Sequence, residues 1–277
     1  MKTIAIASGK GGTGKTSLSV ALLQAHQGDI RLLDCDVEEP NCHLFLDPQK
    51  VNEFGAELLI PKIDTKKCRL CGDCVEACQF NALALAGNQI ILFQELCHGC
   101  GACTLACPHD AIEEIPTNIG QIVQARTESG VEVVKGTLKV GHASAPTVIA
   151  AVKNTTPLQK VKYQIIDAPA GTSCSFAEAV KGADFVILVT EPTPFGLNDL
   201  DLAIEALHKM KLPFGVVINR VREKENLITE YCAKNNYRVL LEIPESRKVA
   251  EYYSQGKSLI DAKPELEEAL KKLLDDL

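Results

Sequence analysis

The sequence predicts an α/β protein whose doubly wound, mostly parallel sheet is interrupted by a smaller inserted α+β module. The first observation is that short runs, apolar nearly throughout, alternate with helical stretches along most of the chain. Such runs are typical of parallel strands buried on both faces, and strand–helix alternation indicates right-handed crossovers. The second observation is that this alternation stops between about Pro61 and Pro116, where eight cysteines fall within an internal repeat.

The expected elements follow from these patterns in chain order. Strands are expected at residues 3–8, 30–36, 163–169, 185–192, 214–220 and 239–244, and helices near 15–27, 174–182, 197–210, 224–235 and 246–255. Residues 119–141 alternate around Ser129–Gly130, which predicts an antiparallel extension of the sheet. Residues 264–277 predict an amphipathic helix, whose five acidic and two basic residues favour packing on the protein over binding an anionic membrane.

Two cysteine runs with the same spacing define the inserted module. Each reads C-x2-C-x2-C-x3-C, and the copies are offset by 29 residues. The candidate ligands are Cys68, Cys71, Cys74 and Cys78, and then Cys97, Cys100, Cys103 and Cys107. A short apolar strand is expected after each run, at 82–85 and 111–115. A repeat with its own ligands, bounded by prolines, predicts a main domain at 1–60 and 117–277 with an insert at 61–116.

The cysteine spacing is that of bacterial ferredoxins, which hold two [4Fe–4S] clusters. The fourth cysteine of each run ligates the other cluster in such proteins, so the expected sets are Cys68, Cys71, Cys74 with Cys107, and Cys97, Cys100, Cys103 with Cys78. Two zinc sites are the alternative, although zinc ribbons use paired C-x2-C units separated by a longer gap. Gln79 stands where Pro108 follows the second run, which predicts an altered environment with every ligand retained.

Composition restricts the class of protein. The 277 residues are 46% hydrophobic, enough for a large core, and carry a formal net charge of −7, which argues against a nucleic-acid partner. The N-terminus passes from a short apolar run directly into a glycine-rich loop, and no stretch is long enough for a membrane helix. Neither a signal peptide nor a membrane anchor is therefore expected. A cytoplasmic location follows, where closely spaced cysteines act as metal ligands.

A phosphate-binding loop follows the first predicted strand. Residues 9–16 match G-x4-G-K-[ST] between a strand and a helix. The backbone amides of this loop and of the helix start would surround phosphate oxygens. The residues concerned are Gly9, Lys10, Gly11, Gly12, Thr13, Gly14, Lys15, Thr16 and Ser17. Lys15 would reach the β- and γ-phosphates, and the Thr16 hydroxyl would bind Mg²⁺. A flexible glycine-rich turn is the alternative.

The loop carries a second lysine, Lys10, so that residues 10–16 read K-G-G-x-G-K-[ST]. This motif resembles the MinD/ParA/Mrp family of P-loop ATPases, which includes the nitrogenase iron protein. The resemblance covers about residues 1–60 and 117–260. It implies that Lys10 reaches the partner's nucleotide in an ATP-sandwiched homodimer, where it would stabilise charge on the phosphates. If Lys10 is instead a solvated charge, no dimer is required.

Acidic residues at strand ends supply the other expected catalytic groups. Asp34 and Asp36 end the second predicted strand, at the edge of the sheet where ligands bind. The resemblance implies that Asp36 positions the attacking water, while Asp34 either assists near Mg²⁺ or caps the strand. Asp167 lies in an Asp-x-Pro-x-Gly segment that resembles the family's Walker B and second switch. It would hold Mg²⁺ through water, with Asp36 and Thr16 nearby, and the Gly171 amide would sense the γ-phosphate.

Later strand ends resemble the family's base-binding loops. Asn219 and Arg220 end the strand at 214–220, and the resemblance implies that Asn219 contacts adenine. Pro244, within Glu242–Glu245, resembles the other loop on the base side. Asparagine at a strand end is more often a turn residue, so these two assignments depend on their order after the stronger motifs.

Cys174 requires a separate interpretation. It lies seven residues after Asp167, an offset at which the nitrogenase iron protein has a cysteine that ligates a bridging cluster. Residues 108–173 contain no cysteine that could complete such a site. We therefore expect Cys174 to be a buried small residue or a helix-start residue.

Together these features predict a MinD-type P-loop ATPase with an inserted ferredoxin-type domain. The expected cofactors are ATP, Mg²⁺ and two [4Fe–4S] clusters. The leading hypothesis is that ATP-dependent dimerisation is coupled to electron transfer with a redox partner. One alternative is an Mrp-type carrier that delivers clusters to an acceptor protein, although the late C-x-x-C of such carriers is missing. The other is a redox-sensing positioning ATPase, which would need a surface to move on.

Overall fold

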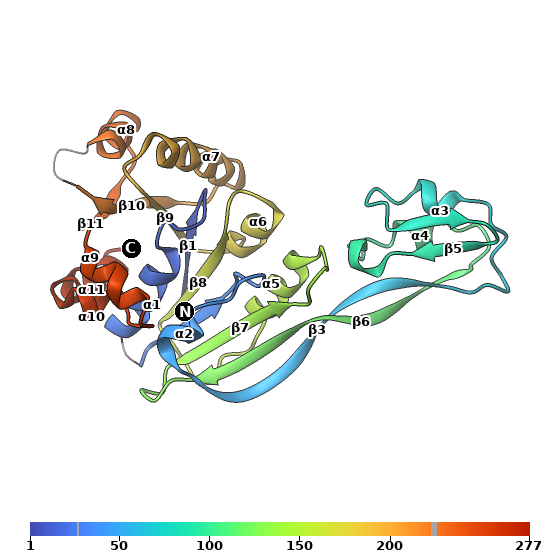
Figure 1. Ribbon diagram of the computed structural model, residues 1–277, viewed down its shortest axis with the longest axis horizontal. Coiled ribbons are helices and arrows are strands. Elements are labelled where there is room, and N and C mark those ends of the chain that lie inside the picture. Colours follow the sequence, from blue (N-terminus) through green and yellow to red (C-terminus); the bar gives the residue numbers. More distant parts are fainter. Residues whose placement is uncertain (27, 223–225) are drawn as a thin grey trace.

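The computed structural model describes residues 1–26, 28–222 and 226–277, and its main body is a large sheet flanked by helices (Figure 1). The strands of this sheet are β1 (Lys2–Ser8), β2 (Ile30–Asp34), β3 (Gln49–Ile63), β6 (Ile112–Arg126), β7 (Glu132–Leu138), β8 (Tyr163–Ala170), β9 (Phe185–Thr190), β10 (Phe214–Val221) and β11 (Val239–Pro244). Their order is β11-β10-β9-β1-β8-β2-β7-β6-β3. Pairing is parallel from β11 to β7 and antiparallel for β6 and β3, which confirms a large, mostly parallel α/β sheet.

Helices cover both faces of the sheet. They are α1 (Lys15–Ala25), α2 (His43–Leu46), α5 (Ala145–Lys153), α6 (Cys174–Val180), α7 (Pro194–Met210), α8 (Leu227–Asn235), α9 (Arg247–Tyr253), α10 (Leu259–Ala262) and α11 (Glu267–Asp275). In β1, Ile4 and Ile6 join the core beneath α1 and α11, whereas Ala5 and Ala7 join the core beneath α5 to α7. Burial on two faces therefore explains why the strand sequences are apolar throughout.

Several predicted element boundaries differ from the structure. The strand expected at 30–36 ends at Asp34. The helix expected at 197–210 begins earlier, at Pro194, because the Thr193 side chain accepts a hydrogen bond from the Gly196 N–H at 2.9 Å and caps it. The predicted end of the first helix at residue 27 and the predicted start of another at residue 224 lie outside the described residues.

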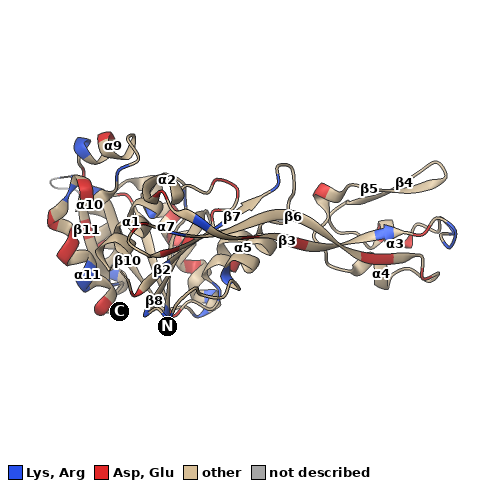
Figure 2. Cartoon of the chain, turned by 90° about the horizontal axis from the view of Figure 1, so that it is seen from below, with Lys and Arg blue, Asp and Glu red and all other residues tan. Residues whose placement is uncertain are grey.

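The strand β3 was not predicted. Most of its residues are exposed, because it is the edge strand, and the sequence QKVNEFGAELLIPKI mixes charges with glycine and proline. It pairs with β6 along almost its whole length, from Gln49 opposite Arg126 to Ile63 opposite Ile112. The domain boundaries predicted at 60/61 and 116/117 therefore fall inside one continuous two-stranded ribbon (Figure 2).

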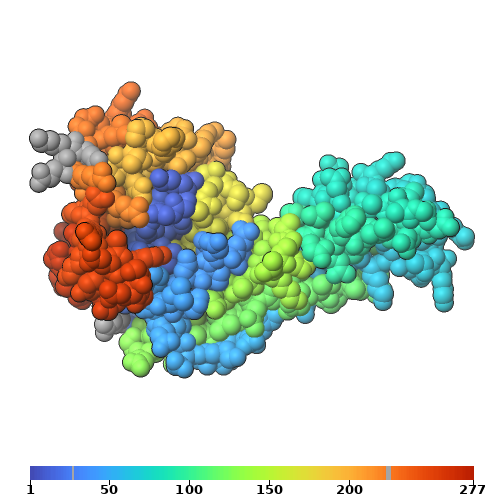
Figure 3. Space-filling model, in the orientation of Figure 1, coloured from blue at the N-terminus to red at the C-terminus, as the bar shows by residue number. Residues whose placement is uncertain are grey.

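The ribbon carries a separate lobe away from the body (Figures 1 and 3). The lobe contains α3 (Asp73–Glu76), β4 (Leu83–Ala86), β5 (Gln89–Leu92), a 3₁₀ turn (Gln94–Leu96) and α4 (Ala102–Leu105). The strand expected at 82–85 corresponds to β4, and its partner is β5, which was not predicted. The strand expected at 111–115 is the first part of β6.

The predictions for 119–141 and for the final stretch are confirmed. β6 and β7 pair antiparallel around a turn in which the Thr127 N–H donates to the Val131 carbonyl at 2.9 Å, and β7 then extends the sheet beside β2. At the C-terminal end, α11 buries Leu270, Leu273 and Leu274 against the core beneath α1. The amphipathic face of this helix is thus packed on the protein.

A buried ion pair between β2 and β7 makes a testable contribution to stability. Arg31 is 2% exposed, and Glu132, 0% exposed, accepts from it at 3.4 Å and from Gln124 at 2.8 Å. We expect Glu132→Ala to lower the free energy of unfolding by about 3–5 kcal/mol, because the Arg31 charge would stay buried without its partner. Chemical denaturation measures this. The exposed pair of Lys50 and Glu53 is the control, since Glu53→Ala should cost about 0–1 kcal/mol.

Candidate functional site

A cavity of about 820 Å³ opens where the central strands end. Its size falls within the usual range for small-molecule and cofactor sites, about 300–1,000 Å³. Residues predicted from the sequence that line it are Gly11, Gly12, Gly14, Lys15, Thr16, Ser17, Asp36, Asn219, Arg220 and Pro244. Segments far apart in the chain therefore meet around one space, at the carboxyl edge of the parallel strands.

Six other predicted residues lie outside the lining of this cavity, namely Gly9, Lys10, Thr13, Asp34, Asp167 and Gly171. Gly9 approaches α7 so closely that a Cβ atom would lie 2.0 Å from the Asp199 carbonyl oxygen. The Gly171 N–H donates to the Ser8 carbonyl at 3.1 Å, so the amide proposed to sense phosphate is engaged with β1.

The loop before α1 is held in shape by residues from distant strands. Gly14 has φ +99° and immediately precedes α1, a conformation that glycine adopts without strain. The Asn219 side-chain amide donates to the Thr13 carbonyl at 2.8 Å, and a Cβ on Gly14 would lie 2.3 Å from that Asn219 nitrogen. Asn219 thus supports the loop in addition to lining the cavity. Lys15, which follows Gly14, is only 6% exposed.

The buried carboxylates form a network that includes a cysteine overlooked in the sequence. Asp167 accepts hydrogen bonds from the Thr16 hydroxyl at 2.7 Å, from the Ser19 hydroxyl at 2.8 Å and from the Cys42 thiol at 3.3 Å. The Cys42 N–H donates to Asp34 at 3.0 Å. Cys42 lies eight residues after Asp34 in an irregular segment, so no spacing rule in the sequence indicates this contact.

Burial and like charges shift the ionisation of these groups. Burial, followed by the Asp167 charge, raises the pKa of Asp36 to about 6. Burial and the Asp167 charge also raise the pKa of Asp34. Burial lowers the pKa of Lys15, and the charges of Asp167 and Asp36 partly oppose this effect. The group of carboxylates is therefore costly to ionise without a nearby cation.

The donor set fits a divalent cation. Within the described residues, Asp34 Oδ1 is buried and has no hydrogen-bond partner. Asp34, Cys42 and Asp167 offer ligand atoms within 4.8 Å of one another. Carboxylate and hydroxyl oxygens at the start of a phosphate-binding loop are typical magnesium ligands. Thr16, Asp36 and Asp167 would hold Mg²⁺, which would neutralise phosphate charge when bound.

Replacing Asp34 should reveal the cost of these buried charges. Because the folded-state pKa of Asp34 is raised above its unfolded value of 3.8, the folded state binds more protons and stability falls as pH rises above about 4. We expect nucleotide-free Asp34→Asn to unfold at a higher temperature than the parent at pH 8, by roughly 2–4 °C or more, and this advantage to shrink toward pH 4. Thermal unfolding in EDTA measures it. Identical pH slopes for the two proteins would contradict the argument.

Lys10 has an intramolecular partner on the rim of the site. Its ammonium lies 3.3 Å from Glu191, which also pairs with Arg220. The Lys10 side chain is 30% exposed and that of Glu191 is 13% exposed. Lys10 is thus neither buried in the loop nor a free surface charge, and its role toward a partner subunit stays a prediction.

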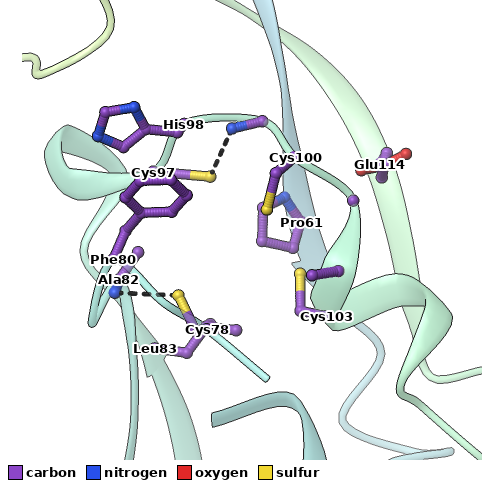
Figure 4. A pocket seen from close by; sticks show the side chains of 13 residues that line it. Pro61, Cys78, Phe80, Ala82, Leu83, Cys97, His98, Cys100, Cys103 and Glu114 are labelled. Carbon is purple, nitrogen blue, oxygen red and sulfur yellow. Dashed lines mark hydrogen bonds between the residues drawn. The ribbon is translucent and has the colours of Figure 1, made fainter. Parts of the chain in front are cut away.

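The eight cysteines of the two runs line two separate pockets in the lobe. One pocket is lined by Cys78, Cys97, Cys100 and Cys103, whose sulfur atoms lie around a shared space (Figure 4). The other is lined by Cys68, Cys71, Cys74 and Cys107. Each pocket thus combines three cysteines of one run with the fourth of the other run. We call the pocket lined by Cys78, Cys97, Cys100 and Cys103 the proximal pocket. The pocket lined by Cys68, Cys71, Cys74 and Cys107 is called the distal pocket.

Backbone amides point at several of these sulfurs. The N–H groups of Ala82, Gly99 and Ala111 donate to sulfur at 3.3, 3.5 and 3.4 Å, and their acceptors are Cys78, Cys97 and Cys107. Burial raises the pKa of Cys74, Cys97 and Cys103, which disfavours their thiolates unless a bound cation compensates. Amide donors and buried thiols are the usual surroundings of an iron–sulfur cluster.

The spacing of the thiols bears on the zinc alternative. A single zinc ion with bonds of about 2.3 Å would bring its thiolates to roughly 3.8 Å from one another. The described residues include all eight of these cysteines. Among the described residues, the only group of three or more potential metal ligands whose ligand atoms all lie within 4.8 Å of one another is Asp34, Cys42 and Asp167. The cysteines of each pocket are therefore spread more widely than a mononuclear site requires.

The structure agrees with one part of the prediction for Cys174 and differs from the other. It is the first residue of α6, as expected for a helix-start residue, but it is exposed and not a buried small residue. Its place at the exposed start of α6 is not revealed by its residue type.

The fold and the site define a class of protein: a P-loop nucleotide-binding protein with a mostly parallel sheet. The chain belongs to the CobQ/CobB/MinD/ParA nucleotide-binding family, whose sequence profile matches residues 4–260. Within the described residues, no helix combines the length and apolar character needed to cross a membrane.

Relatives extend over the whole chain. It is 32% identical to the uncharacterized protein MJ0578 of Methanocaldococcus jannaschii, over 99% of this chain and 95% of that protein. It is 30% identical to MJ0579 of the same organism, over 94% and 92% of the two chains. The structure of the septum site-determining protein MinD of Pyrococcus horikoshii OT3, complexed with Mg-ADP, shares the fold with a TM-score of 0.57 and 23% identity, over 99% of this chain and 95% of that chain.

Proposed function

We propose that this protein is a MinD-type ATPase that holds two [4Fe–4S] clusters and couples ATP-dependent dimerisation to electron transfer with a redox partner. The observation that carries the iron–sulfur part is the division of eight cysteines between two pockets. Three cysteines of one run join the fourth of the other in each pocket, as in two-cluster ferredoxins. When bound, each cluster would accept one electron from a reduced partner protein and pass that electron to an oxidised partner protein.

The nucleotide site supports the ATPase part of the proposal. Lys15 would bind the β- and γ-phosphates from within the loop, and Thr16 and Asp167, already joined by a 2.7 Å hydrogen bond, would hold Mg²⁺. Asp36, on the cavity wall, would position the attacking water. Asn219 and Pro244 would face the base from the other side of the cavity. The protein would act in the cytoplasm as an ATP-dependent homodimer.

Exposure within the lobe favours electron transfer over cluster delivery. Cys71 and Cys100 are exposed, so each pocket has one ligand at the surface where a partner could approach. Cys74, Cys97 and Cys103 are only 8%, 8% and 9% exposed, which favours retention of a cluster over its release. The Mrp-type carrier is thus the second candidate.

Anaerobic purification followed by kinetics tests the proposal. About eight iron and eight sulfide per chain are expected from two cubane sites. Reduced protein should pass electrons to an oxidised acceptor protein faster with Mg-ATP than with Mg-ADP. Equal rates with both nucleotides would contradict gated electron transfer, and rapid transfer of iron and sulfide to an apo-acceptor would favour the carrier.

A further inference from the structure

One short segment contacts both the nucleotide site and the lobe. Residues 136–143, here named the connector, comprise the end of β7 and the first part of the loop before α5. At its start, the Leu138 N–H donates to the Val37 carbonyl at 2.8 Å, and Val37 follows Asp36 directly. At its end, the Ala143 N–H donates to the Glu95 carbonyl at 2.9 Å, two residues before Cys97.

The first contact is tight because of Gly136. A Cβ atom at this position would lie 2.8 Å from Val37 and 2.5 Å from Val152. The absence of a side chain therefore lets Val37 pack directly on β7. Any displacement of the Asp36–Val37 backbone must move the connector or break its hydrogen bond, because both partners lie in a close-packed core.

The second contact leads to only one of the two cysteine pockets. Glu95 lies in the 3₁₀ turn. At the end of this turn, the Cys97 N–H donates to the Gln94 carbonyl at 3.1 Å. The Phe93 N–H, just before this turn, donates to the Ala82 carbonyl at 2.8 Å, and the Ala82 N–H donates to the Cys78 sulfur at 3.3 Å. Both cysteines line the proximal pocket.

Packing repeats part of this asymmetry. Cys97 of the proximal pocket belongs to the same continuous core as Val37 and Val148 of the body, whereas Cys103 of the proximal pocket and Cys74 of the distal pocket share a separate small core with Leu83. In the space-filling view, the yellow-green part of the chain that contains the connector lies against the blue-green lobe (Figure 3). The proximal pocket is therefore joined to the core of the body through Cys97, whereas none of the four cysteines of the distal pocket belongs to that core.

We propose that the connector transmits the nucleotide state at Asp36–Val37 to the proximal pocket and leaves the distal pocket unaffected. This inference rests on the proposed function and specifies its regulation. Because Asp36 lines the nucleotide cavity, Mg-ATP bound there would displace Val37, and the connector would pass this displacement to Glu95 and Cys97. The proximal pocket would be the gated one, and the distal pocket would keep the same properties in every nucleotide state.

Hydrogen–deuterium exchange of the full-length, cluster-loaded protein tests the proposal. Samples with Mg²⁺ and a non-hydrolysable ATP analogue are compared with samples in Mg-ADP. We expect the exchange of amides 93–103 to differ between the two states and that of amides 64–77 to be the same. A difference of equal size in both cysteine loops would overturn the proposal, as would a difference confined to 64–77.

Two variants interrupt the connector at opposite ends. Ala143→Pro removes the N–H that donates to the Glu95 carbonyl. Ala143→Ser is the matched control, because it keeps this N–H and changes only an exposed side chain. Gly136→Ala disturbs the contact with Val37 and leaves the Glu95 bond in place. We expect Ala143→Pro and Gly136→Ala to lose the nucleotide-dependent difference at 93–103, and Ala143→Ser to keep it.

Persistence of that difference in both interrupting variants would overturn the inference. Iron content and nucleotide-dependent protection of residues 11–17 are recorded on the same samples. If the parent protein lacked iron, or lacked nucleotide-dependent protection of residues 11–17, the proposed function would be contradicted instead. Failure of the inference and failure of the proposed function are therefore distinguishable. If one interrupting variant does not fold, the other still decides the outcome, because it acts at the opposite end.

Discussion

Replacing Cys78 together with Cys100 by alanine should leave about four iron atoms per chain, whereas replacing Cys78 together with Cys71 should leave almost none. The first pair lies in the proximal pocket alone, and the second pair removes one ligand from each pocket. A pairing within each run predicts the reverse outcome, because Cys78 and Cys71 would then share one site. The two variants lose the same number of thiols, so the comparison is independent of cysteine count.

Iron and sulfide analysis of anaerobically purified protein measures this result, and electron paramagnetic resonance of the reduced protein shows which signal remains. Cys174→Ala is the control, because Cys174 is exposed and belongs to neither pocket. It should retain about eight iron atoms. A partner experiment with Cys107 and Cys71, both of the distal pocket, should again leave about four. Retention of four iron atoms with Cys78 and Cys71 both replaced would contradict the crossed arrangement.

The two lysines of the phosphate loop should differ in what their removal abolishes. Lys15→Ala should lose nucleotide binding, because Lys15 is 6% exposed and lines the cavity at the start of α1. Lys10→Ala should still bind ATP as a monomer but hydrolyse it roughly 10³-fold more slowly. Its charge would be missing from the partner's phosphates, as when an arginine finger is removed.

Equilibrium dialysis, phosphate release and light scattering with Mg-ATP separate these outcomes. Lys209→Ala, which removes an exposed lysine of α7, is the control and should match the parent. Glu191→Gln should not weaken ATP binding, because Glu191 contacts Lys10 and Arg220 but does not line the cavity. Parental turnover by Lys10→Ala would show that hydrolysis does not need this lysine from a partner.

Sequence patterns predicted those parts of the fold that depend on local chemistry. Strands that are apolar and buried on both faces, such as β1 and β8, are recognisable from their own sequence. The phosphate loop requires glycine at position 14, where φ is +99°. The crossed cysteine sets followed from the resemblance of the spacing to that of two-cluster ferredoxins, in which the fourth cysteine of each run ligates the other cluster. The strands and the phosphate loop are determined by residues near one another in the chain.

The features that escaped prediction depend on contacts between distant segments. β3 is an exposed edge strand, so its residues lack the apolar run that marks a strand. Cys42 becomes part of the site only because β2 and β8 are neighbours, which brings it to Asp167. Glu191, the partner of Lys10, is 181 residues away in sequence. No local pattern encodes such distances.

The β3–β6 ribbon also has a mechanical consequence. Beyond Ile119, whose carbonyl still accepts from the Lys139 N–H at 2.9 Å, the stretch 112–118 pairs with β3 alone over roughly 20 Å. Stretching this arm would break its ladder of hydrogen bonds, but two-stranded ribbons vary widely in twist. The arm is thus stiff in length, and the bond from the Ala143 N–H to the Glu95 carbonyl is a second attachment that restrains its torsion. Two attachments of different kinds therefore fix both the reach of the lobe and its rotation about the arm.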